Sequence, residues 1–223
     1  IRKRHMYRTI RRLSLTFWMA VLLLPTSAFA IPITTWIVNT GPGFDIGGGA
    51  SLYDDRPGAN RGYQSLAARF TLTEDVVIDT VQGWMNWAYG GRARFSILTD
   101  FQGLPGASRF TRALELPATG LNDSDWRGPT GLNWAVTQGD YWLVFEDVPN
   151  NLGFGAMPGG APMPLLGYAS SPGASGVAGA WQRADVLALG VRIGYESVPA
   201  PATTALMLAG LGLLATRRRG RAA

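Results

Sequence analysis

Four aromatic residues are the clearest candidates for binding chemistry in this chain. Trp84, Trp87 and Tyr89 fall within six residues, and Trp126 lies further along. Sugars stack their apolar C–H faces on exposed indole rings, so these residues are candidates for polysaccharide contact. Trp84 and Trp87 are an odd number of positions apart, so on one regular strand they face opposite sides of the sheet. We therefore expect at least one of the two in the core, together with Trp142, which stands inside an apolar run.

A short acidic segment has the closest likeness to a cation site. Asn122, Asp123 and Asp125 resemble the start of a calcium loop, because hard cations prefer clustered oxygen ligands. However, Arg127 stands where a further ligand is needed, and no Glu closes the loop. We expect a capped polar turn here, and Asp123 and Asp125 remain as the alternative metal candidates.

The residues for nucleophilic or thiolate chemistry are missing. The chain has no Cys, and its single His is His5. Removal of the N-terminal segment, argued below, leaves neither residue type, which excludes a Ser-His-Asp triad, a Cys-His pair and the usual zinc sites. A glycoside hydrolase needs two carboxylates facing each other across a cleft, and no spacing singles out such a pair. We predict no catalytic residue and no cofactor, with a secreted carbohydrate-active enzyme as the alternative.

Alternating apolar and polar residues predict that strands position these side chains. The runs are bounded by Gly, Pro, Asn or Asp, and helical periodicity is absent before residue 198, apart from the N-terminal segment. The predicted strands cover residues 67–72, 76–86, 92–99, 109–116, 132–136, 141–146 and 187–195. The charge-free stretch 149–182 is too long for a structureless loop, so we expect short strands near 165–169 and 180–182. This pattern predicts an all-β fold, an antiparallel β-sandwich or jelly roll.

The net charge of +5 hides an acidic body. Six basic residues and no acid occur in residues 1–30, and four Arg and no acid in residues 217–221. The 186 residues between these segments carry ten Arg against fifteen Asp and Glu. A phosphate backbone is repelled by such a body, so nucleic-acid binding is not expected.

The N-terminal segment has the three parts of a secretory signal. A basic stretch ends at Arg12, an apolar run covers residues 13–24, and Ala28 and Ala30 supply the small-residue cleavage pattern. The apolar run is shorter than the roughly 20 residues that a membrane span needs. We expect export and cleavage before Ile31, with an uncleaved anchor helix as the alternative; Met6 is a candidate start.

The C-terminal segment combines a proline motif, an apolar run and a basic cluster. The motif comprises Val198, Pro199, Ala200 and Pro201, and residues 202–216 are uncharged. Fifteen helical residues rise about 22 Å, which is short for a stable span. The basic cluster comprises Arg217, Arg218, Arg219 and Arg221. Because such clusters stay cytoplasmic, the body is expected on the far side of the membrane.

This three-part order resembles the PEP-CTERM sorting signal of Gram-negative bacteria. The resemblance covers residues 198–221, and the central Glu of the family is Ala200 here. It implies recognition by an exosortase, a membrane enzyme thought to cleave near the motif and to release or transfer the body. Family members often occur in bacteria that make exopolysaccharide and biofilm matrix. An ordinary C-terminal tail anchor is the alternative.

The body resembles the exported β-sandwich modules called choice-of-anchor domains. The resemblance rests on spaced aromatic and apolar residues and on two short motifs. The spaced residues are Phe70, Ile78, Trp84 and Trp87. The first motif covers residues 95–98 with 103–106, and the second covers residues 139–143. It implies a secreted surface module rather than an enzyme.

These patterns predict a signal peptide at residues 1–30, a secreted β-sandwich at 31–197 and a sorting tail at 198–223. The expected protein is a non-enzymatic surface or matrix component, anchored briefly in the inner membrane of a Gram-negative bacterium and then placed at the surface or outside the cell. Its expected partners are the Sec-type export machinery, signal peptidase, an exosortase-like enzyme and extracellular polysaccharide. A permanently tethered periplasmic binding domain is a further alternative.

Overall fold

A computed structural model describes residues 33–44, 49–53, 64–120, 122–148, 154–173 and 179–197. The expected cleavage site at Ala28, Ala30 and Ile31, the motif at residues 198–201 and the Arg cluster at 217–221 lie outside the described residues. Within them, there is no helix with the length and hydrophobicity needed to cross a membrane.

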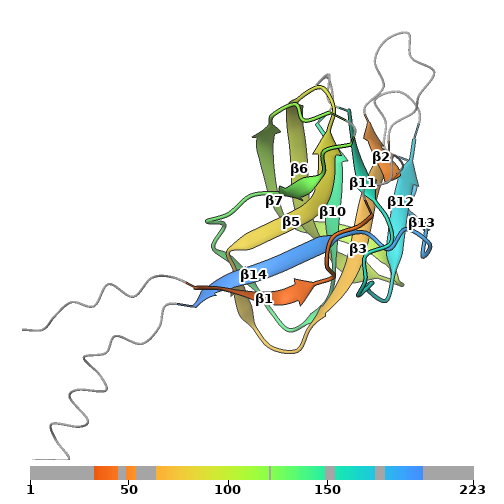
Figure 1. Cartoon of the computed structure of the whole chain (residues 1–223). Helices are drawn as coiled ribbons and strands as arrows, with labels where there is room; N and C mark the ends of the chain where they lie inside the picture. Colours follow the sequence, from red (N-terminus) through yellow and green to blue (C-terminus); the bar gives the residue numbers. More distant parts are fainter. Residues whose placement is uncertain are drawn as a thin grey trace, which may run out of the picture. The chain divides into compact units, whose positions relative to one another are not determined.

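Every regular element among the described residues is a β-strand, which confirms the predicted all-β class (Figure 1). The predicted runs correspond to β3 (Gln64–Leu72), β4 (Val76–Ile78), β5 (Thr80–Trp87), β6 (Gly91–Phe101), β7 (Leu104–Leu116), β9 (Trp134–Val136), β10 (Gly139–Asp147) and β14 (Val191–Ser197). The strands expected near 165–169 and 180–182 are β12 (Tyr168–Pro172) and β13 (Gln182–Arg183). Four strands were not predicted: β1 (Ile33–Asn39), β2 (Gly49–Tyr53), β8 (Asp125–Arg127) and β11 (Phe154–Pro158).

The run predicted as one strand over residues 76–86 is divided at Asp79. β4 pairs with β9 in a separate two-stranded sheet, whereas β5 pairs with β14, β8 and β11. The backbone of Asp79 serves other elements, because its N–H donates to Gly194 and its carbonyl accepts from Leu132. One alternating sequence therefore supplies strands to two sheets.

The larger sheet follows the order β1-β14-β5-β11-β2-β3-β10-β6-β7, with β8 beside β5, β12 beside β3 and β13 beside β12. Every pairing with a described register is antiparallel. β1 and β14 lie side by side in the sheet, although they are the first and the last described strands in sequence order (Figure 1). Buried Thr40, directly after β1, exchanges backbone and side-chain hydrogen bonds with Val191.

Side-chain alternation divides the apolar residues between one large core and one small cluster. In β10, Leu143 and Phe145 enter the large core, whereas Trp142 and Val144 pack on the opposite face of the sheet. This strand is therefore buried on both faces, as its uninterrupted apolar sequence requires. The other strands of the large core present mainly one face to it, which gives a β-sandwich-like arrangement.

Candidate functional site

The sheet formed by β1, β14, β5 and β8 places an arginine among indole rings on its outer face. In β14, Val191 and Ile193 are completely buried, so Arg192 between them points away from the core. In β5, Met85 is buried while Trp84 points outward, directly opposite Trp126 of β8. Strand pairing thus brings these side chains onto one surface.

The rings and the guanidinium are in direct contact. The Cζ atom of Arg192 lies 3.8 Å from the ring centroid of Trp126 and 5.2 Å from that of Trp36 in β1. Trp84 meets Trp126 edge to face, with centroids 5.5 Å apart and planes at 65°. We call Trp36, Trp84, Trp126 and Arg192 the open cluster. A cation over an indole ring contributes about 0.5–1 kcal/mol at a partly exposed site.

The charge of Arg192 is only weakly compensated within the described part of the chain. Its Nε donates to Oδ1 of Asn39 at 3.3 Å, and no described carboxylate lies within the 4.0 Å of an ion pair. Burial lowers the pKa of Arg192, and the charge of exposed Asp125 acts in the opposite direction. The Nε1–H of Trp84 is buried and has no hydrogen-bond partner among the described residues. The cluster therefore carries donor capacity that its own fold does not use.

The predicted aromatic set divides between this surface and the core. Trp84 and Trp126 lie together in the open cluster, and the expected opposite orientation of Trp84 and Trp87 is confirmed. Trp87 is completely buried, so its proposal as a sugar contact is wrong. Gly155 of β11 lies so close to Trp87 that a Cβ at position 155 would be 2.3 Å from its ring. Tyr89 is 67% exposed but packs against Phe154 rather than on the open cluster.

The acidic segment before β8 shows no metal geometry. Asp123 and Asp125 are exposed, and Oδ1 of Asp125 accepts a hydrogen bond from the backbone N–H of Trp126 at 2.7 Å. The described residues contain no group of three His, Cys, Asp or Glu that could hold a metal ion. What the segment does provide is a negative charge near Arg192.

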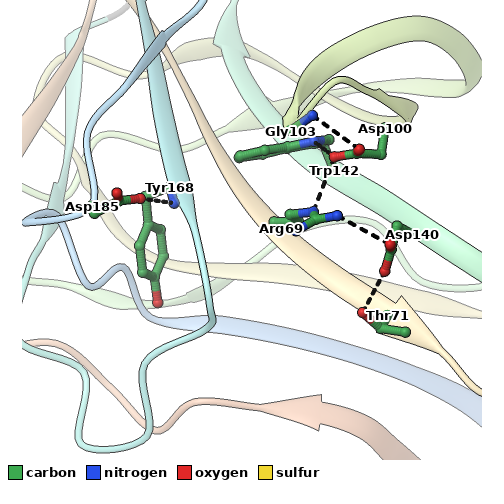
Figure 2. A network of polar contacts seen from close by, with 8 residues as sticks. All are labelled: Arg69, Thr71, Asp100, Gly103, Asp140, Trp142, Tyr168 and Asp185. Carbon is green, nitrogen blue, oxygen red and sulfur yellow. Dashed lines mark hydrogen bonds and ion pairs between the residues drawn. The ribbon is translucent and has the colours of Figure 1, made fainter.

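A second arginine and tryptophan group lies on the outer face of β3, β10 and β6 (Figure 2). Arg69 lies 3.0 Å from Asp100 through Nε and 3.0 Å from Asp140 through Nη2. Although Nε forms this ion pair, its geometry does not make a hydrogen bond. Oδ1 of Asp100 also accepts from Nε1 of Trp142 at 2.8 Å. We call Arg69, Asp100, Asp140 and Trp142 the closed cluster.

Neighbouring residues add hydrogen bonds and apolar contacts to the closed cluster. The backbone N–H of Gly103, in the β6–β7 turn, donates to Asp100 at 3.1 Å, and Thr71 donates to Asp140 at 2.6 Å. Trp142 is 1% exposed, because Leu98, Leu104 and Trp181 pack around its small apolar cluster. Each charged group here faces a partner within the fold, so the closed cluster stabilises the sheet and the hairpin turn.

Trp36 and Arg192 were not predicted as site residues. The β-branched and aromatic residues of β1 were a usable signal for a strand that contains Trp36, and Arg192 is the one cation of β14. Their contact was not readable, because the two residues are far apart in the sequence and meet only through the β1–β14 neighbour relation.

The chain matches no protein-family model, no curated protein and no solved structure. The functional interpretation therefore rests on the residues and their arrangement.

Proposed function

We propose that this protein is an exported, non-enzymatic component of the cell surface or extracellular matrix that contacts polysaccharide. The open cluster is the observation that carries the binding part of the proposal. Partly exposed indole rings offer apolar faces and edges to sugar rings, and Arg192 offers N–H donors to their oxygen atoms. In the closed cluster, Arg69 is neutralised by two carboxylates and the indole N–H of Trp142 is bonded to one of them, so this cluster is not the proposed site.

The cellular location of the protein is proposed from its terminal segments. A signal peptide at residues 1–30 would direct export, and the tail at 198–223, with its short helix, would hold the body at the inner membrane of a Gram-negative bacterium. An exosortase-like enzyme would then act near residues 198–201. The body between them would be a two-layer sandwich of the jelly-roll type, similar to choice-of-anchor modules.

A secreted carbohydrate-active enzyme is the alternative. Such an enzyme needs one carboxyl group as acid and one as nucleophile or base, with the substrate between them. Asp100 and Asp140 are brought together, but Arg69 lies between them and pairs with both. In this arrangement the two carboxylates accept from the fold rather than face a substrate, which supports the binding proposal.

The first experiment is intact mass and cell fractionation of the protein from its native host. The proposal expects a species that begins at Ile31, ends within residues 198–201 and is recovered from the surface or the medium. An Ala200→Glu variant, which restores the residue of the family, should be processed at least as completely. A variant with Arg217, Arg218, Arg219 and Arg221 replaced by Ser should lose orderly processing. An intact tail in the inner membrane for the wild type would instead support a tethered periplasmic domain.

A further inference from the structure

We infer that the open cluster selects anionic polysaccharides, with the guanidinium of Arg192 binding a carboxylate of the sugar chain. This inference rests on the proposed function and specifies its ligand class. It starts from what the cluster cannot do. The guanidinium lies 3.8 Å from the centroid of Trp126, which is stacking distance, so that face of the indole is already covered. Trp84 packs against the same ring in an edge-to-face arrangement. Trp126 is therefore not a free platform for a neutral sugar.

The exposed chemistry of the cluster is instead that of an oriented guanidinium. Nε of Arg192 is directed to Asn39, which leaves the terminal N–H groups on Nη1 and Nη2 without a partner in the described part of the chain. Ring contacts with Trp126 and Trp36 fix the plane of the group. A planar guanidinium with both terminal nitrogens unpaired among the described residues matches the two oxygens of a carboxylate.

The acidic body leaves the binding of any polyanion to a local contact rather than to general attraction. Because the body carries fifteen acidic residues against ten Arg, every polyanion, polygalacturonate included, is repelled at long range, and only a matched partner for Arg192 offsets this repulsion. Partial burial strengthens the interaction of Arg192 with a charge that reaches it. Asp125 is the competing anion, but it is exposed and outside ion-pair distance. A uronic-acid residue combines the carboxylate that Arg192 needs with a sugar ring for the neighbouring indoles.

The test compares three polysaccharides with the full chain, purified in a mild detergent. The probes are polygalacturonate, which carries carboxylates, neutral dextran, and dextran sulfate, which carries sulfates. Affinity electrophoresis measures the retardation of the protein by each polymer at fixed salt. We expect polygalacturonate to retard the wild type and dextran to have no effect. Retardation should fall as the salt concentration rises, because one ion pair carries the selectivity.

Two charge-matched variants separate a site from general charge. Arg192→Gln should weaken binding to polygalacturonate by about tenfold or more, since it removes a charge-assisted pair. Arg109→Gln removes the same charge from an exposed position on β7, without an ion pair in the described structure, and should change binding less than about twofold. Arg192→Lys should recover only part of the affinity, because an ammonium cannot bind bidentately. Circular dichroism of each variant verifies the fold.

The outcomes distinguish the inference from the proposed function. Equal weakening by Arg192→Gln and Arg109→Gln, or stronger retardation by dextran sulfate than by polygalacturonate, would overturn the carboxylate assignment. Retardation by dextran alone would also overturn it, while polysaccharide contact itself would stand. If no polymer retards the wild type, both the ligand class and polysaccharide contact fail. If Arg192→Gln unfolds the protein, Trp36→Phe, which retains a ring beside the guanidinium, must then keep the preference for polygalacturonate over dextran.

Discussion

The open and closed clusters both combine an arginine with tryptophan, but they use these two residue types in opposite ways. In the closed cluster, Arg69 pairs with two carboxylates, and the indole N–H of Trp142 is bonded to one of them. In the open cluster, Arg192 lies over indole rings without a described carboxylate in ion-pair distance, and the indole N–H of Trp84 has no described partner. The bonded polar groups around buried Trp142 hold the sheet together. The unused donors around partly exposed Trp84 leave capacity for a ligand.

The largest expected difference between the clusters is the cost of removing a tryptophan. Trp142→Ala should lower the free energy of unfolding by about 3–5 kcal/mol, because it empties a fully enclosed site. Trp126→Ala, at a partly exposed ring, should cost only about 1–2 kcal/mol in lost ring and cation contacts. Urea unfolding of both variants measures the difference. Equal costs would mean that the open cluster is part of the structural core.

Breaking the closed cluster at its shared acceptor should give the next largest effect. Asp100→Asn keeps the size of the side chain but removes the ion pair with Arg69, and its single carbonyl oxygen cannot replace both carboxylate oxygens for Trp142 and Gly103. We expect a loss of about 1–3 kcal/mol. Chemical denaturation at neutral pH tests this value. An unchanged midpoint would show that the closed cluster contributes nothing measurable.

A pH-dependent loss of stability is expected at β12, the strand that pairs with β3 of the closed cluster. Burial raises the pKa of the Tyr168 hydroxyl, and the hydrogen bond from the backbone of Leu165 acts in the opposite direction. Above the unfolded pKa near 10, the unfolded chain loses this proton while the folded chain retains it. Stability should therefore fall with rising pH, by at most about 1.4 kcal/mol per pH unit.

The contribution of Tyr168 can be isolated by comparison with Tyr168→Phe. The variant loses the acceptor for the N–H of Leu165 at every pH, but it should lack the extra decline above pH 10. Denaturant midpoints at pH 9, 10 and 11 give the two slopes. Parallel slopes would assign the decline to other residues.

A smaller effect is expected from removing the charge of the open cluster. Arg192→Gln should change the free energy of unfolding by less than about 1 kcal/mol, because no described ion pair is lost and a cation–π contact is modest. Arg69→Gln, at the closed cluster, should cost more, since two carboxylates lose their shared partner. Thermal unfolding of the two variants measures both losses of stability. A larger loss for Arg192→Gln than for Arg69→Gln would mean that Arg192 is the structural residue.

Replacing an indole by a phenyl ring in each cluster separates the contributions of the two indole N–H groups. Trp84→Phe should change stability by less than about 1 kcal/mol, because the loss of ring area is partly offset by the removal of a buried donor without a described partner. Trp142→Phe leaves Asp100 without one of its donors and should cost about 1–3 kcal/mol. A double-mutant cycle with Asp100→Asn should show coupling for Trp142 and none for Trp84.

Local patterns were sufficient for the strands with a clear signal of their own. β6 alternates over many residues, β10 is a continuous apolar run, and both were predicted within a few residues of their bounds. β8 has only three residues, and β11, with the sequence FGAMP, contains a Gly and ends in Pro, so neither has a periodic signal. Gly155 in β11 is explained by its close approach to Trp87, which is a tertiary contact. Such strands exist because of their partners rather than their own sequence.

The candidate site was predictable only in part, for the same reason. The opposite orientation of Trp84 and Trp87 followed from spacing alone, but the pairing of Trp84 with Trp126 depends on β8. The approach of Arg192 to Trp36 depends on β1 and β14 being neighbours, which no local rule gives.

The pairing of β1 with β14 also determines when the chain can finish folding. The hydrogen bonds between Thr40 and Val191 span 151 positions. β1 therefore has no strand to pair with until β14, the last strand of the described fold, has been synthesised. Closing so long a loop is entropically costly and makes assembly slow compared with local hairpins such as β6 and β7. For a chain that emerges from its N-terminus, β1 and the edge of β5 that pairs with β14 would wait for residues 191–197. That interval is the period in which exposed strand edges are most vulnerable to proteases and to aggregation.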